Sequence, residues 1–280
     1  MRHWWLAGAV LLAGLTGIPA SSGAQALPLS PARERGQTVS PVFEGWYRNA
    51  DGTYSLSFGY YNRNELEVVE IPLGPANFIS PAPLNGGQPA RFHPRRHWGV
   101  FAVTVPADFG TKRVTWTLVI RGDSIVIPGS LATDWQIDAL EGEAGDNNTP
   151  PRLRFSATGP QGAGPGGITD GPVSATVGKP LTVDVWADDD GSVRNSVVSG
   201  GQPGVPVTLM WFKHQGPGSV SFASATPKVD NKGKATTMAT FSEPGDYVLR
   251  VRANDASGVE SAGHSQCCWS NGFLKVTVTR

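Results

Sequence analysis

Short runs in which apolar and polar residues alternate recur along the chain, and Gly, Pro, Asn or Asp bounds each run. Alternation with a period of two is typical of a β-strand that buries one face. No stretch of useful length carries the period of an amphipathic helix. The pattern therefore predicts an all-β protein built from antiparallel sandwiches.

The first module is predicted at residues 38–140. Its alternating runs lie at 43–49, 53–62, 65–74, 98–106, 112–120, 124–129 and 134–140. Asp51-Gly52 predicts a tight hairpin turn between the first two runs, and Arg121-Gly122-Asp123 predicts another. Short strands with turn signals at this spacing favour a sandwich. Its core is expected to include Trp46, Tyr54, Leu56, Phe58, Val100, Val103, Trp116 and Leu118.

A Gly- and Pro-rich segment at residues 141–172 separates this module from a second one at 173–280. The segment holds few large apolar residues, so it is predicted to be a linker around a short strand-like "RLRFSA". Asn147-Asn148-Thr149 matches a glycosylation triplet, although such triplets arise by chance. The predicted organisation is thus two sandwich domains joined by a linker.

The second module carries motifs beyond its strand pattern. Trp211 precedes a Gly216-Pro217-Gly218 turn, and a later run places Phe241, Pro244, Gly245, Tyr247, Leu249 and Asp255 at fixed spacing. These residues resemble the bacterial PKD-like immunoglobulin module. The resemblance implies an immunoglobulin-like sandwich that serves as a spacer or binding unit, and residues 258–271 depart from it by their length. The first module resembles β-domains of uncharacterised exported bacterial proteins.

The first 26 residues predict an export signal. Arg2 is followed by an apolar run at 4–18, and Ala24-Gln25-Ala26 supplies small residues for cleavage. The run is shorter than the roughly 20 residues of a spanning helix, and no later run is apolar enough to cross a bilayer. We therefore expect a mature chain starting near Leu27 that is periplasmic, on the cell surface or secreted.

Charge narrows the class of partner. The chain has 23 basic and 23 acidic residues, and removal of Arg2 leaves a net charge near −1. Nucleic acids and anionic membranes attract strongly basic faces, which this balance does not provide. A protein or a glycan is the expected partner.

The two cysteines of the chain, Cys267 and Cys268, are adjacent. Their Cα atoms are held about 3.8 Å apart, below the usual disulfide range, so a bond between them would be strained. An adjacent disulfide, free thiols with one buried, and an intermolecular bridge or a metal all remain open. With a disulfide, Trp269 would join the ring in an apolar knob that contacts a ligand.

Two further clusters have an ionic and a structural interpretation. Asp188, Asp189 and Asp190 precede a glycine, which predicts either a weak calcium site or a solvated turn. The segment "ARFHPRRHWG" is predicted to be a basic loop in which Arg95 and Arg96 either contact an anionic ligand or balance nearby acids such as Glu65, Glu67 and Glu70.

The sequence contains no nucleophile elbow, zinc-protease motif, phosphate loop or dinucleotide fingerprint. We therefore predict a non-catalytic exported interaction or structural protein without a cofactor, apart from the calcium alternative. A carbohydrate-binding accessory protein is a second hypothesis, with stacking platforms expected at Tyr60, Tyr61, Trp98 and Trp269. An enzyme or metal carrier is a third, with His264 three residues before Cys267 as a possible copper or zinc ligand.

Overall fold

The computed structural model describes residues 33–140, 149–189, 207–255 and 269–280. The described residues form strands, turns and two short 3₁₀ helices, and none of them lies in an α-helix. No helix in this part of the chain is long and apolar enough to cross a membrane. The predicted all-β class is confirmed.

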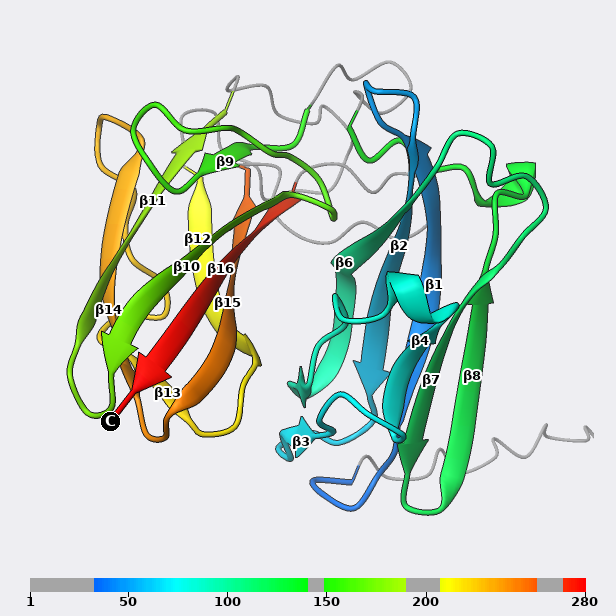
Figure 1. Ribbon diagram of the computed structural model, residues 1–280, viewed down its shortest axis with the longest axis horizontal. Helices are drawn as coiled ribbons and strands as arrows, with labels where there is room; N and C mark the ends of the chain where they lie inside the picture. Colours follow the sequence, from blue (N-terminus) through cyan, green and yellow to red (C-terminus); the bar gives the residue numbers. More distant parts are fainter. Residues whose placement is uncertain (1–32, 141–148, 190–206, 256–268) are drawn as a thin grey trace, which may run out of the picture. The chain divides into compact units, whose positions relative to one another are not determined.

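The first sandwich packs two three-stranded antiparallel sheets, ordered β1-β2-β6 and β4-β7-β8, with a small β3-β5 ribbon (Figure 1). Its elements are β1 (Val39–Arg48), β2 (Tyr54–Asn62), β3 (Val69–Glu70), β4 (Asn77–Ser80), η1 (Ala82–Leu84), β5 (Arg91–Phe92), β6 (Arg95–Val105), β7 (Val114–Ile120), β8 (Asp123–Gly129) and η2 (Thr133–Trp135).

The second sandwich has sheets ordered β9-β11-β14-β13 and β10-β16-β15-β12. Its strands are β9 (Arg152–Arg154), β10 (Ile168–Thr176), β11 (Leu181–Asp188), β12 (Thr208–Gln215), β13 (Val220–Phe222), β14 (Lys234–Phe241), β15 (Gly245–Asn254) and β16 (Trp269–Thr279). Without β10, these orders are the A-B-E-D and C-F-G sheets of an immunoglobulin domain. The immunoglobulin-like architecture therefore follows from strand order alone.

Several predicted elements are corrected by the structure. Residues 134–140 form no strand, because only an isolated bridge between Trp46 and Gln136 continues the sheet there. Strand β9 lies where the short strand was expected, but β10 also starts inside the predicted linker. Strand β10 pairs with β16 in parallel, so the second sandwich is not purely antiparallel.

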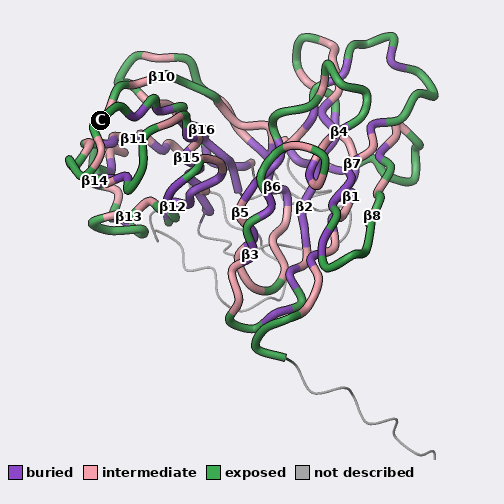
Figure 2. Tube along the Cα trace, turned by 60° about the horizontal axis from the view of Figure 1, so that its bottom comes forward, coloured by how far each residue is buried: buried purple, intermediate pink, exposed green. Residues whose placement is uncertain are grey.

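Each sandwich has its own apolar core. Buried residues lie along the strands of both sandwiches, as the purple segments of Figure 2 show. In the first core, the Phe101 ring lies 5.1 Å from Trp116 and 5.5 Å from Phe58. Of the expected core residues, Trp46 and Tyr54 are only half-buried, and the other six are buried.

The second core contains the two residues that the sequence pattern singled out. Trp211 on β12 is 3% exposed and packs 6.1 Å from the Phe222 ring. The Tyr247 hydroxyl, at the start of β15, donates to the Glu243 carbonyl at 2.8 Å and accepts from the Gly218 N–H at 3.0 Å. Tyr247 therefore closes this end of the sandwich as a tyrosine corner does.

Candidate functional site: the contact between the two sandwiches

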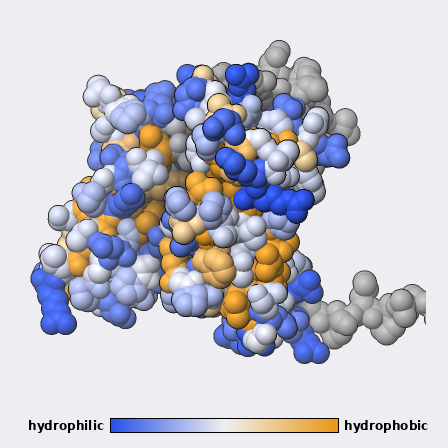
Figure 3. All heavy atoms as spheres, turned by 45° about the vertical axis from the view of Figure 1, so that its right-hand side comes forward, coloured by the Kyte–Doolittle hydropathy of each residue, from blue (hydrophilic) through white to orange (hydrophobic). Residues whose placement is uncertain are grey.

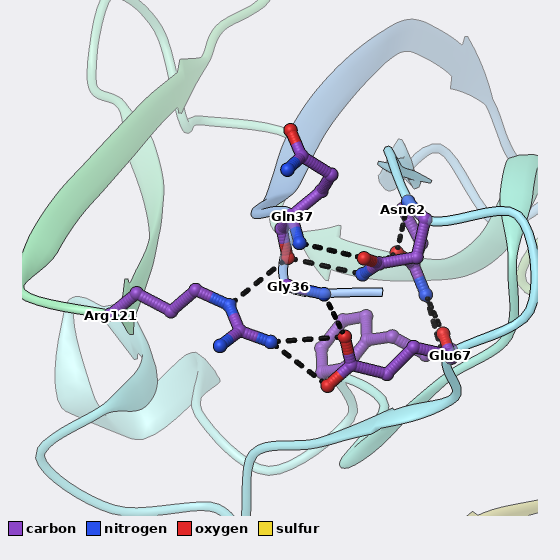
Figure 4. Close-up of polar contacts among 7 residues, drawn as sticks. Gly36, Gln37, Asn62, Glu67 and Arg121 are labelled. Carbon is purple, nitrogen blue, oxygen red and sulfur yellow. Dashed lines mark hydrogen bonds and ion pairs between the residues drawn. The ribbon is translucent and has the colours of Figure 1, made fainter. Parts of the chain in front are cut away.

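The Arg121-Gly122-Asp123 triplet forms the predicted hairpin turn between β7 and β8. Arg121 and Gly122 both have positive φ, 54° and 87°. The Arg121 guanidinium donates to both carboxylate oxygens of Glu67 at 2.8 and 3.0 Å and to the Gln37 carbonyl at 3.3 Å (Figure 4). The Glu67 carboxylate also accepts from the Gly36 N–H. Arg121 and Glu67 therefore hold the segment just before β1 against the turn between β7 and β8.

The basic cluster is not the loop that the sequence predicted, since Arg95 and Arg96 begin strand β6. Arg96 donates to Glu44 at 2.8 Å and lies 3.8 Å above the Trp98 ring. The side chain of Glu44 is only 2% exposed, so this is a nearly buried ion pair. Stacking and pairing together satisfy the Arg96 guanidinium.

The remaining arginines of this region also face acids. Arg91 pairs with Glu70, and Arg95 lies 3.8 Å from Glu65. These ion pairs agree with the alternative in which the arginines of the basic cluster neutralise nearby acidic side chains. A ligand role for Arg95 and Arg96 stays a prediction.

The expectation of exposed aromatic platforms is wrong for Tyr60 and Trp269, which are each 1% exposed. Tyr60 stacks on His97 at 4.9 Å, and its hydroxyl accepts from the His93 N–H at 2.9 Å. Burial raises the pKa of Tyr60 to about 12. Tyr61 and Trp98 are half-buried. These four rings therefore do not form one open stacking surface.

The second sandwich contacts the first through the outer face of β12, β15 and β16. Cross-strand neighbours on this face include Phe212 opposite Arg250 and Arg250 opposite Phe273. The Phe212 ring lies 5.3 Å from His93 and 6.2 Å from His97 of the first sandwich. The Arg250 guanidinium lies 4.5 Å from the Phe212 ring. Phe212 thus packs between two histidines and one arginine.

Hydrogen bonds across this contact come from the end of β12. The Ala90 N–H donates to the His214 carbonyl at 2.8 Å, and the His214 ring nitrogen Nε2 lies 2.9 Å from the Gly87 carbonyl. Gln215 donates to the Gly86 and Gln88 carbonyls, both at 2.7 Å. Backbone and side chains therefore both fix the register of the contact.

A second group of contacts centres on Gly99 of β6. The side-chain amide of Asn271 donates to the Gly99 carbonyl at 2.6 Å and to the Pro165 carbonyl at 2.9 Å. The Trp269 ring covers Gly99, whose φ is +45°. A Cβ at Gly99 would lie 2.7 Å from the nearest Trp269 ring atom, so only glycine fits.

The three histidines of the contact are held neutral. Burial lowers the pKa of His93 to about 4, with help from the positive charges of Arg91 and Arg250. Burial and Arg250 lower the pKa of His97 and of His214 to about 3. Strongly shifted groups often mark functional sites, and here they mark the surface between the sandwiches.

A cleft of about 580 Å³ opens beside this contact. Glu70, Arg91 and Lys213 line one part of it, and Glu243 and Asp246 line another. Lys213 lies 3.4 Å from both Glu70 oxygens, and Arg91 pairs with the same carboxylate. Both cations thus share the Glu70 carboxylate, and Glu243 and Asp246 add negative charge elsewhere in the lining, so the cleft does not gather charge of one sign.

The calcium prediction receives no geometric support from the described residues. Asp188 pairs with Arg154, and Asp190 lies outside the described residues. Within the described ranges, no group of three or more His, Cys, Asp or Glu side chains is arranged to hold a metal ion. A calcium site at Asp188, Asp189 and Asp190 stays a prediction.

The signal segment, Cys267, Cys268, His264 and the first two residues of the triplet, Asn147 and Asn148, also lie outside the described residues. Their predicted roles are unchanged. Of the proposed knob, only Trp269 is described, and it is buried against Gly99.

Comparison with known proteins leaves the family open. No family model and no curated protein matches the chain. Solved structures with some likeness include domains 4 and 5 of the S-layer protein SbsC (12% identity, TM-score 0.24, 65% of this chain and 71% of that one). Others are a titin immunoglobulin tandem (11%, 0.24, 87% and 99%) and the D0-D1 domain of intimin (12%, 0.27, 86% and 97%). Likeness at this level carries no argument, so the fold assignment rests on strand order.

Sequence reasoning missed Phe212, Arg250, His214 and Asn271, which build the contact. A signal for them exists. Trp211 faces the core, so its neighbour Phe212 must point outward, as must every second residue from it. A large aromatic residue on an outer face indicates that something covers that face.

Proposed function

We propose that the protein is a non-catalytic exported protein in which the two sandwiches work as one structural and binding unit. The observation that carries this proposal is the position of the groups with the largest pKa shifts. His93, His97 and His214 contact the opposite sandwich, and Tyr60 stacks on His97. A catalytic group needs access to a substrate, whereas Tyr60 and His214 are buried and His93 and His97 are half-buried against Phe212.

Supporting evidence comes from the polar groups of the contact. Asn271, Gln215 and Trp269 each reach carbonyl groups of the first sandwich. Such directional hydrogen bonds between two surfaces favour one arrangement of them. A spacer or adhesive protein benefits from this, because fixed domains present their loops at a defined separation.

A capture experiment tests the function. The mature chain is immobilised and exposed to an envelope and extracellular fraction, and bound proteins and glycans are quantified by mass spectrometry. We expect saturable capture of a specific protein or glycan by the wild type. In parallel, a panel of peptide, ester and glycoside substrates is assayed. Turnover that the His97→Asn variant abolishes would refute a non-catalytic role.

A glycan is the second candidate partner. Its binding surface would include Trp135 and not the four aromatic residues that the sequence predicted. Trp135 is 48% exposed. The nearby Trp46 is half-buried, and its ring lies 5.4 Å from Tyr54. Figure 3 shows that hydrophobic residues are interspersed with polar ones on the face drawn there. If glycans are captured, a Trp135→Ala variant should lose them, whereas a protein partner should be retained.

A further inference from the structure

A pocket of about 500 Å³ lies beside strand β12 in the second sandwich. Leu209, Met210 and Val229 give it apolar walls, and Met210 is 39% exposed. Lys228 and Arg252 also line it, and among the described residues none of the lining side chains is acidic. The pocket therefore combines apolar surface with positive charge.

Strand β12 is an edge of its sheet in the described part of the chain. In the sheet order β10-β16-β15-β12, its one neighbouring strand among the described residues is β15. The Trp211 N–H donates to the Ala225 carbonyl at 2.8 Å, so Trp211 directs its backbone groups away from β15. Backbone direction alternates along an antiparallel strand, so Leu209 has the same direction as Trp211. Its N–H and C=O thus point toward the edge where the pocket lies.

Asn254 supplies a second unused polar group. It sits opposite Thr208 at the end of β15 and is 8% exposed. Its Oδ1 atom is buried and has no hydrogen-bond partner among the described residues. Most buried polar side-chain atoms in proteins do have a partner, so an orphaned one beside a pocket indicates a ligand that donates a hydrogen bond.

We propose that this pocket binds an extended peptide segment that carries an apolar side chain flanked by acidic residues. The inference rests on the proposed binding function and names the chemistry of the partner. The peptide backbone pairs with Leu209 at the edge of β12, in the manner of strand addition. Its apolar side chain contacts Leu209, Met210 and Val229, and its acidic side chains face Lys228 and Arg252. A peptide N–H is the donor for Asn254.

A defined peptide provides the test. The probe is a fluorescein-labelled heptapeptide, Thr-Glu-Thr-Leu-Thr-Glu-Thr, in which leucine and both glutamates share one face of a strand. Fluorescence anisotropy with the mature chain should show saturable binding. Replacing both glutamates by lysine, or methylating the leucine backbone nitrogen, should weaken binding at least about tenfold. Binding that is unaffected by N-methylation would exclude backbone pairing and overturn the proposal.

Protein variants locate the site. Met210→Glu places a negative charge in the pocket wall and should weaken probe binding at least about tenfold. Met238→Glu is the matched control, because Met238 is 46% exposed on β14 of the other sheet. Lys228→Glu should weaken the glutamate probe and improve the lysine one. No saturation up to about 1 mM, or equal effects of the two methionine variants, would overturn the proposal.

The outcome is separable from that of the proposed function. If the wild type and Met210→Glu capture the same partner equally from the envelope fraction, the proposed binding function is supported and the proposed peptide site is overturned. If neither protein captures a partner although the probe binds at the pocket, the peptide site is supported and the proposed function of binding an envelope partner is overturned. Self-association of the wild type that Met210→Glu abolishes would assign the pocket to a second copy and overturn the peptide proposal.

Discussion

At the scale of single residues, Gly99 is the sharpest test of the contact between the sandwiches. An alanine Cβ there would lie 2.7 Å from Cζ2 and 2.9 Å from Nε1 of Trp269. We expect Gly99→Ala to lower the free energy of unfolding by about 1–3 kcal/mol beyond its backbone cost, as overpacking does. Thermal and urea unfolding followed by tryptophan fluorescence provide the measurement.

Gly110→Ala controls for the backbone cost of this change. Gly110 also has positive φ, +61°, but its nearest neighbour in the direction of a Cβ is 3.8 Å away. Both variants carry the strain of a non-glycine residue at positive φ, and only Gly99→Ala collides with the second sandwich. If the two variants are equally destabilised, the Trp269 ring does not pack on Gly99 as the structure has it.

The sequence indicates some of these residues and hides others for a physical reason. Trp211 and Tyr247 are recognisable because local strand alternation and a tight turn fix where they point. Tyr60 and Trp269 look like platforms in the sequence, since their sequence neighbours do not reveal that the His97 ring stacks on Tyr60 and that Trp269 packs on Gly99 of the other sandwich. Burial by residues distant in sequence leaves no local pattern.

At the scale of strands, β15 depends on the tyrosine corner at its start. Tyr247→Phe removes the donor to the Glu243 carbonyl and the acceptor of the Gly218 N–H. Leaving such buried groups unpaired costs about 1–3 kcal/mol, and we expect that loss in urea unfolding. Tyr54→Phe is the control, because its half-buried ring has no hydroxyl hydrogen bond among the described residues. Equal stability of both variants would contradict the corner.

Strands could be predicted from the sequence where they are long and their apolar and polar residues alternate. Strands β1, β2, β6, β7 and β8 all overlap the runs predicted for the first module. Strands β4 and β5 escaped prediction because they are four and two residues long within a Pro-rich stretch. The start of strand β10 falls in the predicted linker because an exposed edge strand needs few apolar residues, and its parallel pairing with β16 has no local signal.

At the scale of the whole molecule, the contact between the sandwiches should make stability depend on pH. The folded pKa values of His93, His97 and His214 are about 4, 3 and 3, below the 6.5 of an unfolded histidine. The unfolded chain therefore takes up protons first as pH falls. The stabilisation is fully present above pH 6.5 and is lost progressively as pH falls toward each folded pKa.

We expect the free energy of unfolding, measured by urea titration, to be flat above about pH 7 and to fall below about pH 6.5. Each histidine adds up to about 1.4 kcal/mol per pH unit to the slope. The pKa values of Asp51, Glu67 and Asp230 are lowered by hydrogen bonds, so these carboxylates weaken the fold only below about pH 4.5. The window between about pH 6.5 and 4.5 therefore isolates the histidines.

A His97→Asn variant identifies the source of this slope. It removes one of the three titrating rings, so the slope between about pH 6.5 and 4.5 should fall by about one third, whatever the variant does to stability at pH 7. The rings face the guanidinium groups of Arg91, Arg250 and Arg252. A wild-type slope near zero would mean that the rings are hydrated and that the sandwiches are not held together as the structure describes.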